Sequence, residues 1–358
     1  MKKMLAIAMA MTMGLSLVAC GGGNDAADST AEAPAAEAEE TTGTEENAAG
    51  TETEAAEEVP SAGSEGAYTV GICQLVQHEA LDAATEGFMD GLNEELGEGT
   101  VTFDVQNAQN DSNTCSTIVN GFVSGNVDLI LANATPALQA AQAATSEIPI
   151  LGTSVTEYGV ALNIDDFDGT VGGNISGTSD LAPLDEQAAM LNELFPDAKN
   201  VGLIYCTAEA NSQYQVDEVQ KALEEKGYTC KQYGFADSND LQSVATTAVS
   251  ENEVLYVPTD NTVASNAEIL NNIAEPAKVP VIAGEEGICA GCGVATLSIS
   301  YYDLGVGTGK MAAKILTGEA DISTMPIEYA PQFTKKYNAS LCESLGITVP
   351  DDYVAIGE

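Results

Sequence analysis

From residue 67 onward the chain alternates short apolar runs with segments of helical length, and this alternation limits the possible folds more than any other feature. The first apolar runs lie at 68–76, 101–108, 128–134 and 148–155, with longer mixed segments between them. Repeated strand–helix units of this kind form a mostly parallel sheet with right-handed crossovers. The pattern therefore predicts an α/β fold.

The alternation lapses once and then restarts, which predicts two lobes. Residues 156–183 are rich in Gly, Asn, Asp and Ser, a composition typical of connecting segments. After them, strands are predicted at 200–206, 228–235, 254–259 and 279–283, with helices between them. We expect two Rossmann-like lobes with a cleft between them, in which 67–160 together with 293–358 form the first lobe and 180–285 the second.

The N-terminus has the features of an export signal. Lys2 and Lys3 precede an apolar stretch that is short for a membrane span and ends in Leu17-Val18-Ala19-Cys20. This run resembles a lipobox, which implies that 1–19 is a signal peptide and that Cys20 is lipidated, although an ordinary cleaved signal is an alternative. Residues 20–66 lack Lys, Arg and aromatic side chains, and we expect a disordered acidic tether. The expected location is the extracytoplasmic face of the membrane, held by the lipid.

The charge balance excludes several partners and cofactors. The formal net charge is −44 and the chain contains no Arg, so no basic surface exists for nucleic acid or a polyanionic ligand. The single histidine, His78, does not support a His-rich metal site, and we expect neither a metal nor another cofactor. The excess of acidic groups favours a neutral or cationic small molecule.

Polar residues gather where the predicted strands end. Because ligands of open α/β sheets bind at the carboxyl ends of the strands, these residues are candidates for a site in the cleft. A helix N-terminus there could hold a carboxylate without Arg, while Asp260, Glu285 or Glu209 could accept hydrogen bonds from an amine. The alternative is that these residues only cap helices and form turns.

Longer stretches resemble the tryptophan/tyrosine-type substrate-binding lipoproteins of ABC transporters. The resemblance rests on VGICQLVQHEALDAATEGFMDGL, DLILANATPALQAA, IPILGTSVTE, LIYCTAEANSQYQV, YVPTDNTVAS, PVIAGEE and YYDLGVGTGKMAAKIL, in the order of the family and across most of 67–350. It implies a type I periplasmic-binding-protein fold whose hinged lobes capture an amino acid, an aromatic one such as tryptophan, and deliver it to an ABC permease. The chain is expected to be a monomer and not an enzyme. The resemblance and the strand ends together give these ligand-binding candidates: Gln74, Thr135, Pro136, Ser154, Thr156, Asn211, Ser212, Asp260, Asn261 and Glu285.

Some features leave other functions open. Cys289 and Cys292 form a C-x-x-C pair that could be a disulfide, two inert thiols, a redox pair or half of a zinc site. Glu209 with Glu285 could serve an acid–base enzyme. A sensor that presents its ligand to a receptor would have the same sequence features as a transport protein. The chain has no Trp, so any stacking on the ligand rests on Tyr or Phe, with Tyr158, Tyr205, Tyr256 and Tyr301 as candidates.

Overall fold

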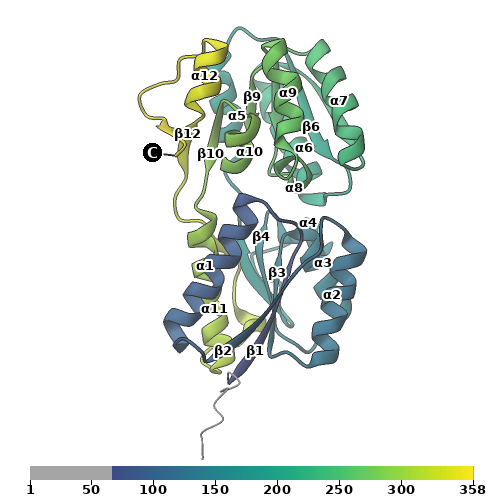
Figure 1. Ribbon diagram of the computed structural model, residues 1–358, viewed down its shortest axis with the longest axis vertical. Coiled ribbons are helices and arrows are strands. Elements are labelled where there is room, and N and C mark those ends of the chain that lie inside the picture. The colour runs from purple at the N-terminus through teal and green to yellow at the C-terminus, as the bar shows by residue number, and fades with distance from the viewer. Residues whose placement is uncertain (1–66, 358) are drawn as a thin grey trace, which may run out of the picture. The chain divides into compact units, whose positions relative to one another are not determined.

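The structure, a computed structural model, describes residues 67–357, which belong to one compact unit of the chain and contain two sheets (Figure 1). The predicted signal peptide, Cys20 and the acidic tether lie outside the described residues. Within the described part, no helix has both the length and the apolar character needed to cross a membrane.

The first lobe is built on a six-stranded sheet in the order β11-β5-β4-β3-β1-β2, and every pairing in it is parallel. Its strands are β1 (Tyr68–Gln74), β2 (Val101–Asn107), β3 (Leu129–Asn133), β4 (Ile150–Val155), β5 (Ile175–Ser179) and β11 (Glu328–Tyr329). Its helices are α1 (Glu79–Leu96), α2 (Ser112–Gly125), α3 (Thr135–Ala144), α4 (Tyr158–Leu162) and α11 (Tyr301–Leu316), with a short 3-10 turn at Ile322–Thr324.

The second lobe is built on a seven-stranded sheet in the order β13-β12-β10-β9-β8-β6-β7, parallel except for the pair β10 and β12. Its strands are β6 (Asn200–Cys206), β7 (Thr229–Phe235), β8 (Val254–Val257), β9 (Val281–Ala283), β10 (Ala295–Ser298), β12 (Thr334–Tyr337) and β13 (Val354–Ala355). Its helices are α5 (Leu184–Leu194), α6 (Ala210–Glu225), α7 (Ser238–Glu251), α8 (Asn261–Ala264), α9 (Ala267–Ala277), α10 (Glu286–Cys292) and α12 (Ala339–Leu345).

Both faces of each sheet are buried, which explains why the strands read as continuous apolar runs. In β3, Ile130 packs towards α2 and α3, while Leu129 and Leu131 pack with Phe88 of α1 and with α11 on the opposite face. The second sheet is likewise enclosed between two apolar clusters. The α/β prediction with two mostly parallel sheets is confirmed.

Glycines allow α1 and α11 to lie backbone against backbone. A Cβ on Gly305 would fall 2.1 Å from the Ala84 carbonyl oxygen, and one on Gly87 would fall 2.1 Å from that of Tyr302. This contact fastens α11 to the first lobe, although α11 follows β10 of the second sheet.

The sheet topology corrects two predicted boundaries. The prediction that 293–358 as a whole returns to the first lobe is wrong, because β10, β12 and β13 in that stretch pair within the second sheet, and only α11, the 3-10 turn and β11 return. Residues 156–183, predicted as a connection, contain β5, which extends the first lobe beyond residue 160. The Gly, Ser and Thr content of β5 gave no apolar signal, because its ISGTS sequence is buried largely through small polar side chains.

Candidate functional site

A cavity lies between the two lobes and is lined by residues of both. The space between its lining atoms, including the part open to solvent, is about 270 Å³. The first lobe supplies residues from the start of α1, the end of β4, the segment after β5 and the start of α11; the second supplies residues from α6, from the segment after β8 together with α8, and from the start of α10. The lining residues are His78, Leu81, Ser154, Asp180, Asn211, Thr259, Asp260, Asn261, Ala264, Glu285 and Tyr301.

Direct hydrogen bonds join the lobes beside this cavity. The ring Nε2 of His78 lies 3.2 Å from Asn261 Oδ1, and Asn110 Nδ2 donates to Thr262 Oγ1 at 2.9 Å. Gln215 Nε2 donates to Thr156 Oγ1 at 3.4 Å. The two lobes therefore meet through polar side chains, which separate at a lower free-energy cost than an apolar interface would.

Buried polar atoms without a hydrogen-bond partner concentrate in the cavity lining. Among the described residues seven such side-chain atoms occur, and five of them belong to residues of the lining. These five are His78 Nδ1, Ser154 Oγ, Asp180 Oδ1, Asn211 Oδ1 and Thr259 Oγ1. Because an orphaned buried polar atom is costly, their convergence on one space indicates a site that a polar ligand completes.

The lining is acidic. Asp180 is buried, and its Oδ2 accepts a hydrogen bond from the Tyr301 hydroxyl at 3.0 Å. Burial raises the pKa of Asp180, and burial also raises the pKa of Glu285 to about 7. Burial and the neighbouring Glu209 carboxylate raise the pKa of Asp260. With no Lys or Arg in the lining, a ligand ammonium would relieve this accumulation of buried carboxylates.

Two of these carboxylates also cap helices. Glu285 accepts hydrogen bonds from the backbone N–H groups of Gly287, at 2.6 Å, and Ile288 at the start of α10. Asp260 accepts from Val263 N at 2.9 Å and from Cys206 N at 2.6 Å. The same side chains therefore cap helices and line the cavity, so their capping role does not exclude them from the candidate site.

The strand ends of the first lobe carry backbone conformations that are unusual for their residues. Ala134, after β3, has φ 91°, and Ser154, in β4, has φ 53°. Ala134 precedes α3, whose first turn has no side-chain cap, and Pro136 stands at its second position. Positive φ at non-glycine residues clusters at functional sites, so these positions mark the same edge of the sheet.

The structure brings together five of the ten candidates in the lining: Ser154, Asn211, Asp260, Asn261 and Glu285. The others lie outside it. The amide of Gln74 bonds to Asp82 and Thr85 within the first lobe, and Thr156 meets Gln215 of the second lobe. Ser212 Oγ accepts a long hydrogen bond, at 3.4 Å, from Asn211 Nδ2 within α6. The remaining two, Thr135 and Pro136, are the first two residues of α3.

Several lining residues were not among the candidates. Asp180 directly follows β5, and it was missed because that strand was not predicted. Leu81 and Ala264 carry no signal beyond apolar character. His78 was noted only as the single histidine, and Thr259 was not among the candidates. Tyr301 was a candidate for stacking on the ligand, and it does line the cavity.

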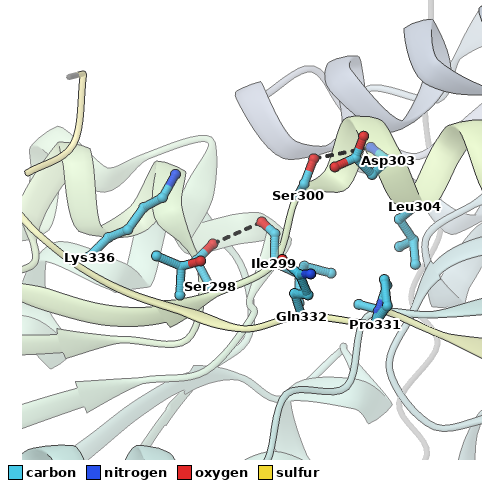
Figure 2. A pocket seen from close by; sticks show the side chains of 10 residues that line it. Ser298, Ile299, Ser300, Asp303, Leu304, Pro331, Gln332 and Lys336 are labelled. Atoms are coloured by element: carbon cyan, nitrogen blue, oxygen red, sulfur yellow. Dashed lines mark hydrogen bonds between the residues drawn. The ribbon is translucent and has the colours of Figure 1, made fainter. Parts of the chain in front are cut away.

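A larger hollow lies along the segments that connect the lobes (Figure 2). Its empty volume is about 890 Å³, and it runs from Ser298 to Leu304 and from Ala330 to Lys336. Ser298 Oγ donates to the Ile299 carbonyl at 3.1 Å, and Ser300 Oγ accepts from Asp303 N at 3.1 Å. None of the orphaned polar atoms found in the described chain belongs to this lining, so its size alone does not make it the better candidate.

The C-x-x-C pair has the environment of structural thiols. Cys289 and Cys292 lie in α10, both buried and both free, and burial raises the pKa of each thiol. Reactive cysteines need a lowered pKa and exposure. The pair therefore has neither property that a thiol oxidoreductase requires.

The comparisons with known proteins agree on one family. The family described as ABC transporter substrate binding protein matches residues 69–356. A tyrosine-binding protein of Clostridioides difficile (strain R20291) is 38% identical over 263 residues, which cover 72% of this chain and 75% of that protein.

Two solved structures share the fold. An ABC domain from Streptococcus pneumonia in complex with L-Trp has a TM-score of 0.76 at 30% identity, covering 79% of this chain and 96% of the other. The ligand-free, open structure of a substrate-binding protein with adhesive properties from Clostridium difficile has a TM-score of 0.63 at 38% identity, covering 81% and 99%. The structure thus superposes better on the complex than on the open protein, despite the lower identity.

Proposed function

Since the chain belongs to the ABC transporter substrate-binding protein family and has its type I periplasmic-binding-protein fold, we propose that it captures an aromatic amino acid between its lobes. The observation that carries the proposal is the cavity lined by both lobes, in which five orphaned polar atoms face an acidic space. The tyrosine-binding relative and the L-Trp complex support the choice of an aromatic amino acid.

The two ends of an amino acid match different parts of the lining. The ammonium group would donate to Asp180 Oδ1 from the first lobe and to Asn211 Oδ1 from the second, both of which are acceptors without a partner. The carboxylate would lie beside the hydroxyl of Ser154 and extend beyond the lining towards the uncapped first turn of α3. Helix N–H groups and a hydroxyl can hold a carboxylate without Arg, which this chain lacks.

The side chain of the ligand would rest against the apolar part of the lining. Leu81, Ala264 and the Tyr301 ring form that part. Because the lining comes from both lobes, a bound ligand stabilises the closed arrangement over the open one, and closure is the change that a transporter could read.

The export and delivery steps belong to the same proposal. The lipobox at Cys20 supports an extracytoplasmic protein anchored by lipid, and membership of the family supports delivery of the ligand to an ABC permease. The role is that of a non-enzymatic receptor. Incorporation of labelled fatty acid into the chain, and its loss in Cys20→Ser, would test the anchor.

Binding is tested by a thermal-shift screen of the purified chain against the common amino acids, followed by calorimetry of each stabiliser. We expect stabilisation by L-tyrosine or L-tryptophan with one ligand bound per chain, because binding to the folded state alone raises the melting temperature. Stabilisation by none of the aromatic amino acids would overturn the proposed ligand class.

A further inference from the structure

A relay of hydrogen bonds fixes the chemistry of the histidine in the cavity. It starts at Glu209, a buried carboxylate at the start of α6. Glu209 Oε2 accepts from the backbone N–H of Asn261 at 3.0 Å and from Asn261 Nδ2 at 2.6 Å. Glu209 Oε1 accepts from the backbone N–H and the hydroxyl of Thr262, at 2.9 and 2.8 Å. Because the Glu209 carboxylate oxygen can only accept, the group of Asn261 that faces it must be the amide nitrogen, which donates, and not the amide oxygen.

The orientation of the Asn261 amide then fixes the tautomer of His78. With its nitrogen on Glu209, the amide presents Oδ1, which can only accept, to His78 Nε2 at 3.2 Å. Nε2 must therefore carry the proton. Burial lowers the pKa of His78 against the opposing effects of Asn261, Glu209 and Asp82, which favours the neutral ring. In a neutral ring with a proton on Nε2, Nδ1 is an acceptor.

This acceptor is buried, has no partner and belongs to a residue of the cavity lining. Among the other unpartnered atoms there, Asp180 Oδ1 is charged, and the Ser154 and Thr259 hydroxyls can also donate. His78 Nδ1 and Asn211 Oδ1 are neutral and can only accept, and the proposed function gives Asn211 Oδ1 to the ligand ammonium. A ligand ammonium is better matched to the Asp180 carboxylate, whose Oδ1 is also free. A neutral acceptor is left for a neutral donor, and an aromatic amino acid offers one only as a phenol O–H or an indole N–H.

We propose that His78 Nδ1 accepts a hydrogen bond from the aromatic side chain of the ligand, so that the protein selects tyrosine or tryptophan over phenylalanine. This inference rests on the proposed function. Phenylalanine would fill the same space but leave Nδ1 buried and unpaired. A site built to hydrogen-bond a substrate group rejects the analogue that lacks the group, and the expected discrimination is roughly ten- to hundredfold in Kd.

Calorimetric titration of L-tyrosine, L-tryptophan and L-phenylalanine into the purified chain, and into His78→Phe, tests the proposal. His78→Phe keeps an aromatic ring and removes the acceptor. We expect the variant to lose more affinity for tyrosine and tryptophan than for phenylalanine, since the loss of the interlobe hydrogen bond to Asn261 affects all three ligands alike. Gln77→Ala, at an exposed neighbour outside the lining, is the matched control and should keep the preference of the wild type.

The outcomes separate this inference from the function beneath it. If the wild type binds all three amino acids equally, or if His78→Phe weakens all three equally, the specificity role is wrong and the proposed function stands. If the wild type binds none of them, the proposed function itself falls.

A second measurement does not depend on a variant. Because His78 is the single histidine of the chain, a sample labelled with ¹⁵N-histidine gives one pair of ring nitrogen signals from the protein. We expect the tautomer protonated at Nε2, and a shift of the Nδ1 signal with tyrosine or tryptophan but not with phenylalanine. A ring protonated at Nδ1, or equal shifts with all three, would overturn the proposal.

Discussion

Replacement of Asp180 by Asn should weaken binding of the ligand without destabilising the ligand-free protein. Asp180 is buried, Tyr301 occupies its Oδ2, and its Oδ1 has no partner in the cavity lining. Asparagine has nearly the same size, and its carbonyl can accept from the ligand ammonium. Its amide nitrogen then donates to the Tyr301 oxygen, and the Tyr301 hydroxyl must turn to another acceptor. The change therefore removes the charge and preserves the geometry.

The magnitude follows from the kind of hydrogen bond that is lost. Hydrogen bonds to charged groups contribute about 1.5 to 3 kcal/mol and neutral ones about 0.5 to 1.5 kcal/mol, so the loss is about 1 to 2 kcal/mol. This corresponds to roughly a 5- to 30-fold increase in Kd. Calorimetry with L-tyrosine and L-tryptophan measures it directly.

The stability of the ligand-free protein should change in the opposite sense. Burial raises the pKa of Asp180, so the native state holds this proton more tightly than the unfolded chain. The wild type therefore loses stability as the pH rises from about 3.9, the pKa in an unfolded chain, through the raised native value. Asp180→Asn lacks this loss, and above that range its melting temperature without ligand should equal or exceed that of the wild type.

The control is Asp185→Asn, the same substitution at an exposed position of α5 outside the cavity lining, which should leave Kd unchanged. An unchanged Kd in Asp180→Asn would refute the assignment of the ammonium to this carboxylate. A fall in melting temperature would show instead that Asp180 supports the fold.

Three further predictions follow from the described contacts. Gly305→Ala should destabilise the protein by about 1 to 3 kcal/mol in urea unfolding, because its Cβ would meet the α1 backbone, whereas Gly307→Ala in the same helix has open space and should not. Affinity for the amino acid should fall as the pH falls through about 7, because Glu285 takes up a proton there. Glu285→Gln should flatten this dependence of Kd on pH, and the same dependence in the variant and the wild type would contradict the prediction. A thiol reagent should label the half-buried Cys230 before the buried Cys289 in the native protein, and the reverse order would reopen the redox alternative.

The sequence predicted the parts of the fold that rest on periodicity. Buried parallel strands such as β3 and β8 are short apolar runs, and the segments between them have the length and mixed polarity of surface helices. Both lobes could therefore be recognised from the sequence. The order in which the strands pair is a long-range property. The pairing of β12 with β10 could not be read from TKKY, whose composition resembles a loop.

The candidate site was predicted where a strand end coincided with a polar residue. Ser154, Asn211 and Asp260 follow this rule, and the structure places all three in one cavity lining. Gln74 also follows it, but its amide is used inside the first lobe. Only the packing of α1 on the first sheet decides that difference, since Asp82 and Thr85 lie within reach of the amide on that helix.

The ligand itself offers the most direct test of the central claim, that an aromatic amino acid binds between the lobes. The chain contains no Trp, so excitation at the red edge of the indole band reports on added L-tryptophan alone. The fluorescence anisotropy of L-tryptophan should rise on titration with the protein, saturate at one ligand per chain, and be reversed by excess L-tyrosine. Anisotropy that stays at the value of free tryptophan, with no effect of L-tyrosine in calorimetry, would contradict the account.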